Sequence, residues 1–267
     1  MTSFKELANL TNRTALITGA TGHLGKVFSD TLAELGSDLI LVDLSESKLE
    51  KLSLDLRKQW GIKVDHFVCD LEIQEKRTKL ITKLIDSKVE LNILVNNAAF
   101  TGGLQLQGWN VPFENQSIDT WRRAIEVNLN AVFDLSQGLL PLLRKAQGAN
   151  IINISSIYGL YAPDWKLYED TNLSNPAAYA VSKSGLIGLT RWLSTTISPK
   201  IRVNAIAPGG ILRDQPIEFV NRYCKGVPLG RMATEEDLRG VLAFLATDLS
   251  KYVTGQVLTV DGGRGIV

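Results

Sequence analysis

The chain has 267 residues, 45% of them hydrophobic, and its 29 basic and 28 acidic residues leave a formal charge of +1. This balance excludes a broad electrostatic surface for nucleic acid or for an anionic membrane. The first residues lack a signal-like apolar run, no window approaches a membrane span, and Cys69 and Cys224 have no metal-ligand spacing. We therefore expect a cytoplasmic protein without a metal site, acting on a small molecule.

Short apolar runs alternate with longer amphipathic stretches along almost the whole chain. Buried strands are predicted at 14–18, 38–42, 64–69, 92–96, 150–155, 202–207 and 256–260. Helices are predicted between them, at 22–35, 45–60, 72–88, 118–145, 177–198 and 234–247. This order predicts an α/β fold, a doubly wound seven-stranded parallel sheet of the Rossmann type with helices on both faces. Because no linker or repeat divides the chain, residues 1–267 are expected to form a single domain.

Two long segments, residues 157–176 and 208–230, interrupt the alternation of strands and helices. Each follows the carboxyl end of a predicted strand, where open α/β sheets bind their ligands. Long loops inside a compact domain commonly serve as lids or binding loops. We therefore expect both segments to contact the substrate.

The segment TGATGHLG follows the first predicted strand and places Gly19, Gly22 and Gly25 at the start of a helix. Glycine permits a tight turn and a close approach of the backbone to a diphosphate, which the helix N-terminus then binds. Tight strand-to-helix packing could also explain the glycines, but their place in the first βαβ unit favours a nucleotide site. Thr21 could add a hydroxyl contact or simply cap the turn.

Asp43 ends the second predicted strand. A carboxylate there can accept hydrogen bonds from the ribose hydroxyls of NAD and repels the 2′-phosphate of NADP. No Arg or Lys lies in the glycine loop or directly after Asp43 to receive such a phosphate. The sequence therefore predicts NAD rather than NADP, although Asp43 could instead cap the next helix, a role that Ser45 would fill equally well.

The segment YAVSK places Tyr179 and Lys183 one turn apart on one face of a predicted helix. A neighbouring ammonium favours the phenolate, so the pKa of Tyr179 is expected to fall. Such a phenol can give a proton to a carbonyl oxygen or take one from an alcohol. Alone, Tyr179 and Lys183 could simply lie on a solvent-exposed helix face. In a chain that also has a predicted nucleotide site, the pair indicates catalysis.

In their order and spacing, the motifs of this chain resemble those of the short-chain dehydrogenase/reductase family over almost its whole length. They are TGATGHLG, Asp43, CDL at 69–71, NNAA at 96–99, EVNL at 126–129, NISS at 153–156, YAVSK at 179–183, RVNAIAPGG at 202–210 and TGQVLTVDGG at 254–263. The resemblance implies a homotetramer or homodimer. Together with the glycine segment it predicts a cofactor site of Gly19, Thr21, Gly22, His23, Leu24, Gly25, Asp43, Asp70, Leu71, Asn97, Ala98, Ala99, Tyr179, Lys183, Pro208, Gly209 and Ile211.

The resemblance also implies a catalytic tetrad of Asn128, Ser156, Tyr179 and Lys183. Tyr179 would be the acid/base, and Ser156 would stabilise the charge on the substrate oxygen. Lys183 would bind the nicotinamide ribose, and Asn128 would hold a water that links Lys183 to solvent. Two alternatives stay open: Ser155 could replace Ser156, and Asn128 could only join a helix to a strand.

Two features depart from the usual family pattern. The spacing TGxxGxxG is typical of the longer sugar-nucleotide epimerases and dehydratases, and the interval from Ser156 to Tyr179 is longer than in most members. The inserted aromatic and acidic residues suit a polyhydroxylated ligand, so Asp164 and Trp165 are predicted to contact substrate, with Arg213 for an anionic group. A solvated loop or subunit contact would explain them equally. The insertion and GILRDQP resemble dehydrogenases linked to bacterial surface-carbohydrate and flagellin modification.

The leading hypothesis is an NAD-dependent oxidoreductase that interconverts a secondary alcohol and a ketone, on a polar and carbohydrate-like substrate. Two alternatives remain: a sugar-nucleotide epimerase or dehydratase that keeps its NAD bound, and a non-catalytic protein that senses a dinucleotide. Net consumption of added NAD or NADH separates the first from the second.

Overall fold

The structure is a computed structural model that describes residues 1–102 and 106–267. The strands form one parallel sheet in the order β3-β2-β1-β4-β5-β6-β7. The strands are β1 (Thr14–Thr18), β2 (Asp38–Asp43), β3 (Val64–Val68), β4 (Ile93–Asn96), β5 (Asn150–Ile154), β6 (Arg202–Pro208) and β7 (Val257–Val260). The predicted seven-stranded parallel sheet is confirmed, with strand ends within one residue of the prediction.

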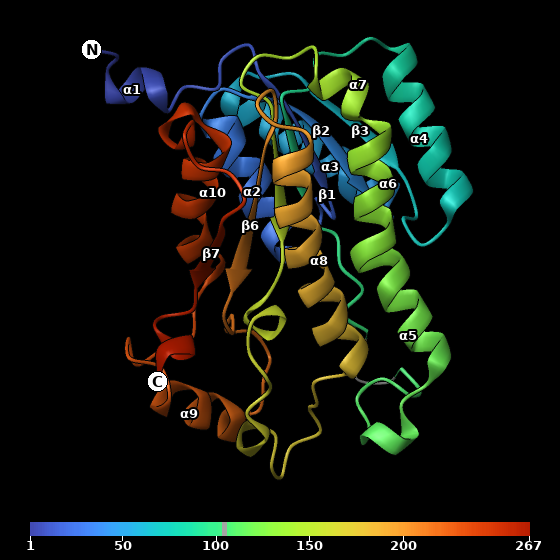
Figure 1. Ribbon diagram of the computed structural model, residues 1–267, viewed down its shortest axis with the longest axis vertical. Helices are drawn as coiled ribbons and strands as arrows, with labels where there is room; N and C mark the ends of the chain where they lie inside the picture. The colour runs from blue at the N-terminus through green and yellow to red at the C-terminus, as the bar shows by residue number, and fades with distance from the viewer. Residues whose placement is uncertain (103–105) are drawn as a thin grey trace.

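Helices connect the strands in the alternating pattern that the sequence predicts (Figure 1). They are α1 (Phe4–Leu7), α2 (His23–Glu34), α3 (Glu46–Trp60), α4 (Gln74–Asp86), α5 (Ile118–Ile125), α6 (Ala131–Gly138), α7 (Leu140–Leu143), α8 (Ala177–Thr196), α9 (Ile217–Lys225) and α10 (Arg239–Ala246). The predicted helix 118–145 is interrupted by a π-helical segment, Glu126–Asn130, and the predicted loop 208–230 contains α9. Within the described residues, none of the helices combines the length and hydropathy of a membrane span.

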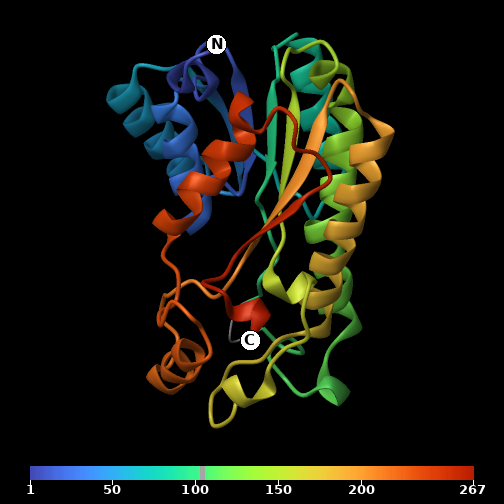
Figure 2. The same cartoon turned by 60° about the vertical axis from the view of Figure 1, so that its left-hand side comes forward.

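The helices cover both faces of the sheet (Figures 1 and 2). On one face α2, α3 and α10 pack against strand residues such as Ile93 and Val95. On the other face α4, α6, α7 and α8 pack against residues that alternate with these, such as Leu94. Because successive side chains of a strand point to opposite faces, a strand buried on both sides needs an unbroken apolar run, which is the pattern of ILVN in β4.

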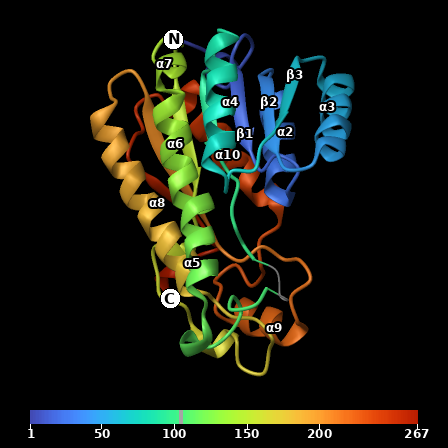
Figure 3. The same cartoon turned by 90° about the vertical axis from the view of Figure 1, so that its right-hand side faces the viewer.

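The strand order reverses between β1 and β4, which lie side by side in the middle of the sheet. Their connections leave on opposite faces, so a crevice opens between them at the carboxyl edge of the sheet. Figure 3 shows α9 and the long loops gathered beyond this edge. The fold thus brings the glycine segment, the end of β5 and the N-terminal half of α8 toward one place.

Candidate active site

A cavity of about 1060 Å³ lies at this edge of the sheet. It is lined by segments that follow β1, β2, β3, β4, β5 and β6 and by one face of α8. Every residue predicted to contact the cofactor lines it, together with Ser156 and Arg213. Asn128, Asp164 and Trp165 do not belong to its lining.

The glycines of the segment TGATGHLG have two uses. Gly19 and Gly25 allow close packing within the protein, and Gly22 leaves the start of α2 open to a ligand. Gly19 has φ +64°, and a Cβ at Gly25 would lie 2.0 Å from the Gly19 carbonyl oxygen, so neither position accepts a side chain. Gly22 is different because it precedes α2 without such a clash, and no side chain caps the helix there. The N–H groups of the first turn therefore face the cavity without a side-chain partner, as a diphosphate site requires.

Asp43 ties the glycine segment to the end of β2. Its Oδ2 accepts hydrogen bonds from the backbone N and the Oγ1 of Thr21, at 2.7 and 2.8 Å, and its Oδ1 accepts from Leu44 N. It makes no contact that would cap α3, so the capping alternative is not supported. A carboxylate has about four acceptor positions, and three are used here. A ribose bound at Asp43 must therefore share or displace the Thr21 bonds.

Two lysines that were not predicted from the sequence also line the cavity. Lys26 lies in the first turns of α2, and Lys48 lies in the first turn of α3. Neither lysine lies in the glycine loop or directly after Asp43. Their nearness to the cofactor site was therefore not evident from the sequence. Their helices carry them to the same crevice as the Asp43 carboxylate.

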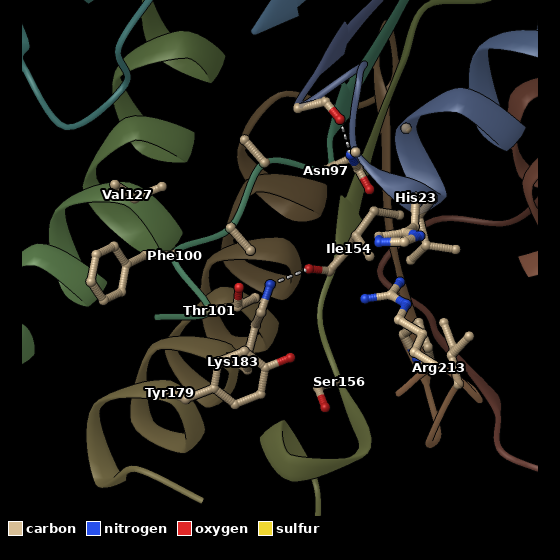
Figure 4. A pocket seen from close by; sticks show the side chains of 18 of the residues that line it. His23, Asn97, Phe100, Thr101, Val127, Ile154, Ser156, Tyr179, Lys183 and Arg213 are labelled. Atoms are coloured by element: carbon tan, nitrogen blue, oxygen red, sulfur yellow. Dashed lines mark hydrogen bonds between the residues drawn. The ribbon is translucent and has the colours of Figure 1, made fainter. Parts of the chain in front are cut away.

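Tyr179 and Ser156 line the same part of the cavity (Figure 4). Burial raises the pKa of Tyr179, while the nearby Ser156 hydroxyl and the positive charge of Arg213 act against the rise. The expected fall in this pKa is therefore not found. The low-dielectric surroundings of the phenol outweigh the groups that favour the phenolate.

The two neighbouring serines make different contacts. Ser155 Oγ donates to the backbone carbonyl of Lys183 at 2.9 Å and is committed to holding α8. Ser156 Oγ accepts from Tyr158 N at 3.2 Å, which leaves its own proton free for the cavity and for Tyr179. Ser156 therefore has a hydroxyl proton available to the cavity, whereas that of Ser155 is already used.

Lys183 is only 2% exposed, and its Nζ donates to the Ile154 carbonyl oxygen at 2.7 Å (Figure 4). Its Nζ lies 5.8 Å from the centre of the Tyr179 ring. Burial lowers the pKa of Lys183 to about 8 because the ammonium loses much of its hydration. Its charge is consequently sensitive to small changes near neutral pH.

Asn128 lies in the π-helical segment between α5 and α6 and is 1% exposed. Its Oδ1 accepts from Phe100 N at 2.6 Å, and its Nδ2 donates to Ser182 Oγ at 3.0 Å. Asn128 therefore joins the loop after β4 to the residue before Lys183. Its predicted role in holding a water stays a prediction. A π-bulge is often found at functional sites.

Part of the cavity wall is aromatic, and its rings were not among the site residues predicted from the sequence. Tyr158 and Tyr168 line it with their hydroxyl oxygens 2.6 Å apart, and Phe219 packs on Tyr168. Tyr168 and Phe219 come from the two loops predicted to contact substrate, so both loops reach the cavity. The contact between Tyr168 and Phe219 could not be predicted, because the two residues are far apart in the sequence.

Asp164 and Trp165 lie outside this cavity. The Asp164 carboxylate accepts from Arg264 Nη2 at 2.7 Å and lines a second cavity, and Trp165 is 57% exposed and tilted against Tyr168. The short turn that contains Trp165 directs Leu167 and Tyr168 inward instead. Asp164 pairs with Arg264 and Trp165 lies against Tyr168, so neither position supports the predicted contact with substrate.

Known proteins resemble this chain over almost its whole length. The family profile described as enoyl-(acyl carrier protein) reductase matches residues 19–264. The 3-oxoacyl-(acyl-carrier-protein) reductase FabG of Thermotoga maritima is 33% identical over 261 residues, covering 95% of this chain and 98% of the relative. Post-translational flagellin modification protein A of Campylobacter coli is 30% identical over 259 residues, covering 96% and 100%.

Solved structures of dehydrogenases also resemble this chain. A short-chain dehydrogenase of Leptospira borgpetersenii with bound NAD+ has a TM-score of 0.84 and 30% identity, covering 99% of this chain and 96% of that one. A gluconate 5-dehydrogenase of Burkholderia cenocepacia in complex with NADP and tartrate has a TM-score of 0.86 and 28% identity, covering 99% and 100%. The fold and site are those of a nicotinamide-dinucleotide oxidoreductase. The chain belongs to the short-chain dehydrogenase/reductase family, as its motifs predicted.

Proposed function

We propose that this protein is a reductase or dehydrogenase that interconverts a secondary alcohol and a ketone with NAD(H). The observation that carries the proposal is the convergence of Ser156, Tyr179 and Lys183 in the cavity that also contains the uncapped N-terminus of α2. A dinucleotide-sensing protein would not need the serine, tyrosine and lysine together. When bound, the dinucleotide supplies or accepts the hydride.

The residues of the site then have separate tasks. Ser156 donates a hydrogen bond to the substrate oxygen and holds it toward Tyr179. Because burial keeps Tyr179 protonated at neutral pH, its phenol can give a proton to the oxygen of a ketone as that oxygen gains charge. Lys183 is placed one turn further along α8 to bind the ribose and hold the positive charge beside the phenol. Asn128 keeps the loop after β4 against that turn.

The substrate we propose is a polyhydroxylated, carbohydrate-derived compound. Segments 157–176 and 208–230 both contribute to the walls, and the paired hydroxyls of Tyr158 and Tyr168 offer hydrogen bonds among aromatic faces. A gluconate dehydrogenase with bound tartrate and a flagellin modification protein are among the similar proteins. The FabG relatives favour an acyl substrate as the second candidate. A continuous apolar wall would suit that candidate better than this cavity does.

The test is a screen of keto-sugars, sugar alcohols, hydroxy acids and a 3-oxoacyl thioester, with NAD(H) and NADP(H), followed at 340 nm. We expect net turnover of the nicotinamide with at least one carbohydrate-derived compound. Conversion of a sugar nucleotide without any net change in NADH would instead support the epimerase or dehydratase alternative. Turnover of the thioester alone would contradict the substrate class and leave the reaction class standing.

We expect Asp43→Ala to weaken NADH binding and to narrow the advantage of NADH over NADPH. The carboxylate would accept the ribose hydroxyls, and a hydrogen bond to a charged group contributes roughly 1.5–3 kcal/mol, so NADH binding should fall by about tenfold or more. Fluorescence titration with NADH and NADPH measures both affinities. Lys26 and Lys48 offer the opposing influence, because their charges favour a 2′-phosphate.

The Thr21 bonds require a control, because Asp43 also holds the glycine segment. Loosening that segment would weaken both cofactors equally, whereas ribose selection changes their ratio. Asp43→Asn keeps an acceptor for Thr21 but removes the negative charge, so it should shift the ratio with a smaller loss of NADH affinity. A wild type that already prefers NADPH would contradict the assignment of NAD.

We also propose a homo-oligomer, a dimer or tetramer, assembled through the outer faces of α5, α6 and α8. Large apolar side chains are exposed there: Ile118, Phe133, Val181 and Trp192. Exposed apolar groups that gather on neighbouring helices are commonly covered by another chain. Light scattering at micromolar concentration should give a multiple of 29.3 kDa, and a monomer mass would contradict this proposal.

A further inference from the structure

Arg213 is held at the edge of the main cavity by a short pairing of two loops. Ile211 forms a parallel bridge with Ala233, and Leu212 N donates to Ala233 O at 2.8 Å. Arg213 and Glu235 each lie two residues beyond this bridge, and Glu235 begins a 3-10 turn there. Arg213 Nε accordingly donates to Glu235 Oε1 at 3.2 Å. The backbone pairing thus determines where this guanidinium lies.

Glu235 connects Arg213 to the glycine side of the cavity. Glu235 begins a turn that leads into α10, and α10 packs against α2 in the core. The Glu235 Oε1 lies 3.9 Å from Nδ1 of His23, the first residue of α2. Arg213 and His23 therefore lie beside one another at the cavity wall, as Figure 4 shows.

Two positive groups consequently face the same space. The N-terminus of α2 has no side-chain cap and carries the positive end of the helix dipole. Arg213 uses only its Nε on Glu235, and within the part of the chain that the structure describes its two Nη groups donate no hydrogen bond. A guanidinium offers paired donors that match two phosphate oxygens at once. An anion between these groups would satisfy both.

We propose that Arg213 is a cofactor-binding residue that holds the diphosphate of the dinucleotide against the N-terminus of α2. The inference rests on the proposed use of NAD(H). Glu235 keeps Arg213 in position before binding and shares it with the diphosphate afterwards. From the sequence, Arg213 is instead predicted to bind an anionic group of the substrate.

The substrate assignment is the competing explanation, because the charge of Arg213 also reaches Tyr179. The contacts of Arg213 favour the cofactor explanation over the substrate explanation. Arg213 is tied through Glu235 to His23, on the diphosphate side, and shares no hydrogen bond with Ser156 or Tyr179 among the described residues. The two explanations predict losses for different ligands, which allows a direct test.

The experiment measures ligand binding to Arg213→Ala, Arg213→Lys and the wild type without any substrate. NADH or NADPH, whichever the wild type binds more tightly, is titrated by fluorescence. ADP-ribose, which contains the diphosphate, is measured by competition, and adenosine, which lacks it, by ligand-observed NMR. Arg231→Ala is the matched control, because Arg231 belongs to the same stretch of chain, pairs with Asp237 and does not line the cavity.

We expect Arg213→Ala to weaken the dinucleotide and ADP-ribose by about tenfold to a hundredfold, the effect of losing a charge-assisted hydrogen bond. Adenosine binding should not change, Arg213→Lys should lose less, and Arg231→Ala should match the wild type. Unchanged ADP-ribose affinity in Arg213→Ala, with or without a higher KM for substrate, would overturn the inference. An equal loss for adenosine would also overturn it, because the effect would then not depend on the diphosphate. A wild type that binds neither dinucleotide would contradict the proposed function itself.

Discussion

Tyr179→Phe should reduce turnover by roughly 10²–10⁴-fold, the usual contribution of a general acid or base. The substitution removes one oxygen and keeps the ring, which packs beside Trp109 and Ala124 in a small apolar cluster. The loss should appear in kcat, because the phenol would act on the substrate oxygen as its charge develops. Steady-state kinetics with the substrate identified by the screen measure it.

The affinity for NADH provides the control for Tyr179→Phe. Binding of the dinucleotide should change little, because the phenol would act on the substrate oxygen, whereas the proposed diphosphate and adenine contacts come from other residues. Ser156→Ala should give a loss in kcat of a similar kind, whereas Ser155→Ala should act mainly on stability, since Ser155 holds the backbone of Lys183. Turnover retained in Tyr179→Phe would contradict the assignment of the acid/base.

Local patterns explain why so much of the fold and site could be predicted. The strands are short apolar runs and the helices are amphipathic stretches. Each of these patterns can be recognised within a short window of sequence. The glycine loop is similar: Gly19 and Gly25 are required by a contact within one short segment. The topology then brings the carboxyl ends of successive strands together, so Asp43 could be assigned to the ligand-binding edge from its place in the chain. Ser156 was assigned through the family resemblance, which also supported the role of Tyr179.

Contacts between distant segments explain what could not be predicted. Tyr168 and Phe219 meet across the cavity although they come from different loops, while Trp165, in the same turn as Tyr168, faces outward. Lys48 reaches the cavity only because α3 begins beside the end of β2. The spacing of Tyr179 and Lys183 indicates proximity, but not the degree of burial that reverses the expected shift in the tyrosine pKa.

Lys183→Met should abolish most of the activity and yet remove a cost to stability. The pKa of Lys183 falls from 10.5 to about 8 in the folded protein because the charged form is buried. A shift of that size corresponds to about 3 kcal/mol by which the folded state disfavours the ammonium. The folded pKa is the lower one, so the full cost applies below pH 8. It is relieved as pH rises from about 8 toward the unfolded value.

The difference in unfolding free energy between wild type and Lys183→Met isolates this group. Methionine leaves the Ile154 carbonyl without its donor, which costs about 1–3 kcal/mol at every pH and offsets the gain at pH 7. The pH dependence is unaffected by that constant loss. Urea unfolding from pH 7 to pH 10 should therefore show the wild type gaining stability relative to the variant above pH 8.

Lys200→Met supplies the reference for removing a lysine, because Lys200 is exposed just after α8. A constant difference between wild type and Lys183→Met across this range would mean that the buried ammonium has an ordinary pKa. The loss of activity would then reflect only the missing ribose contact. If the predicted trend is found, the protein keeps at its active site a charge that weakens the fold, because the dinucleotide and the Tyr179 phenol require it.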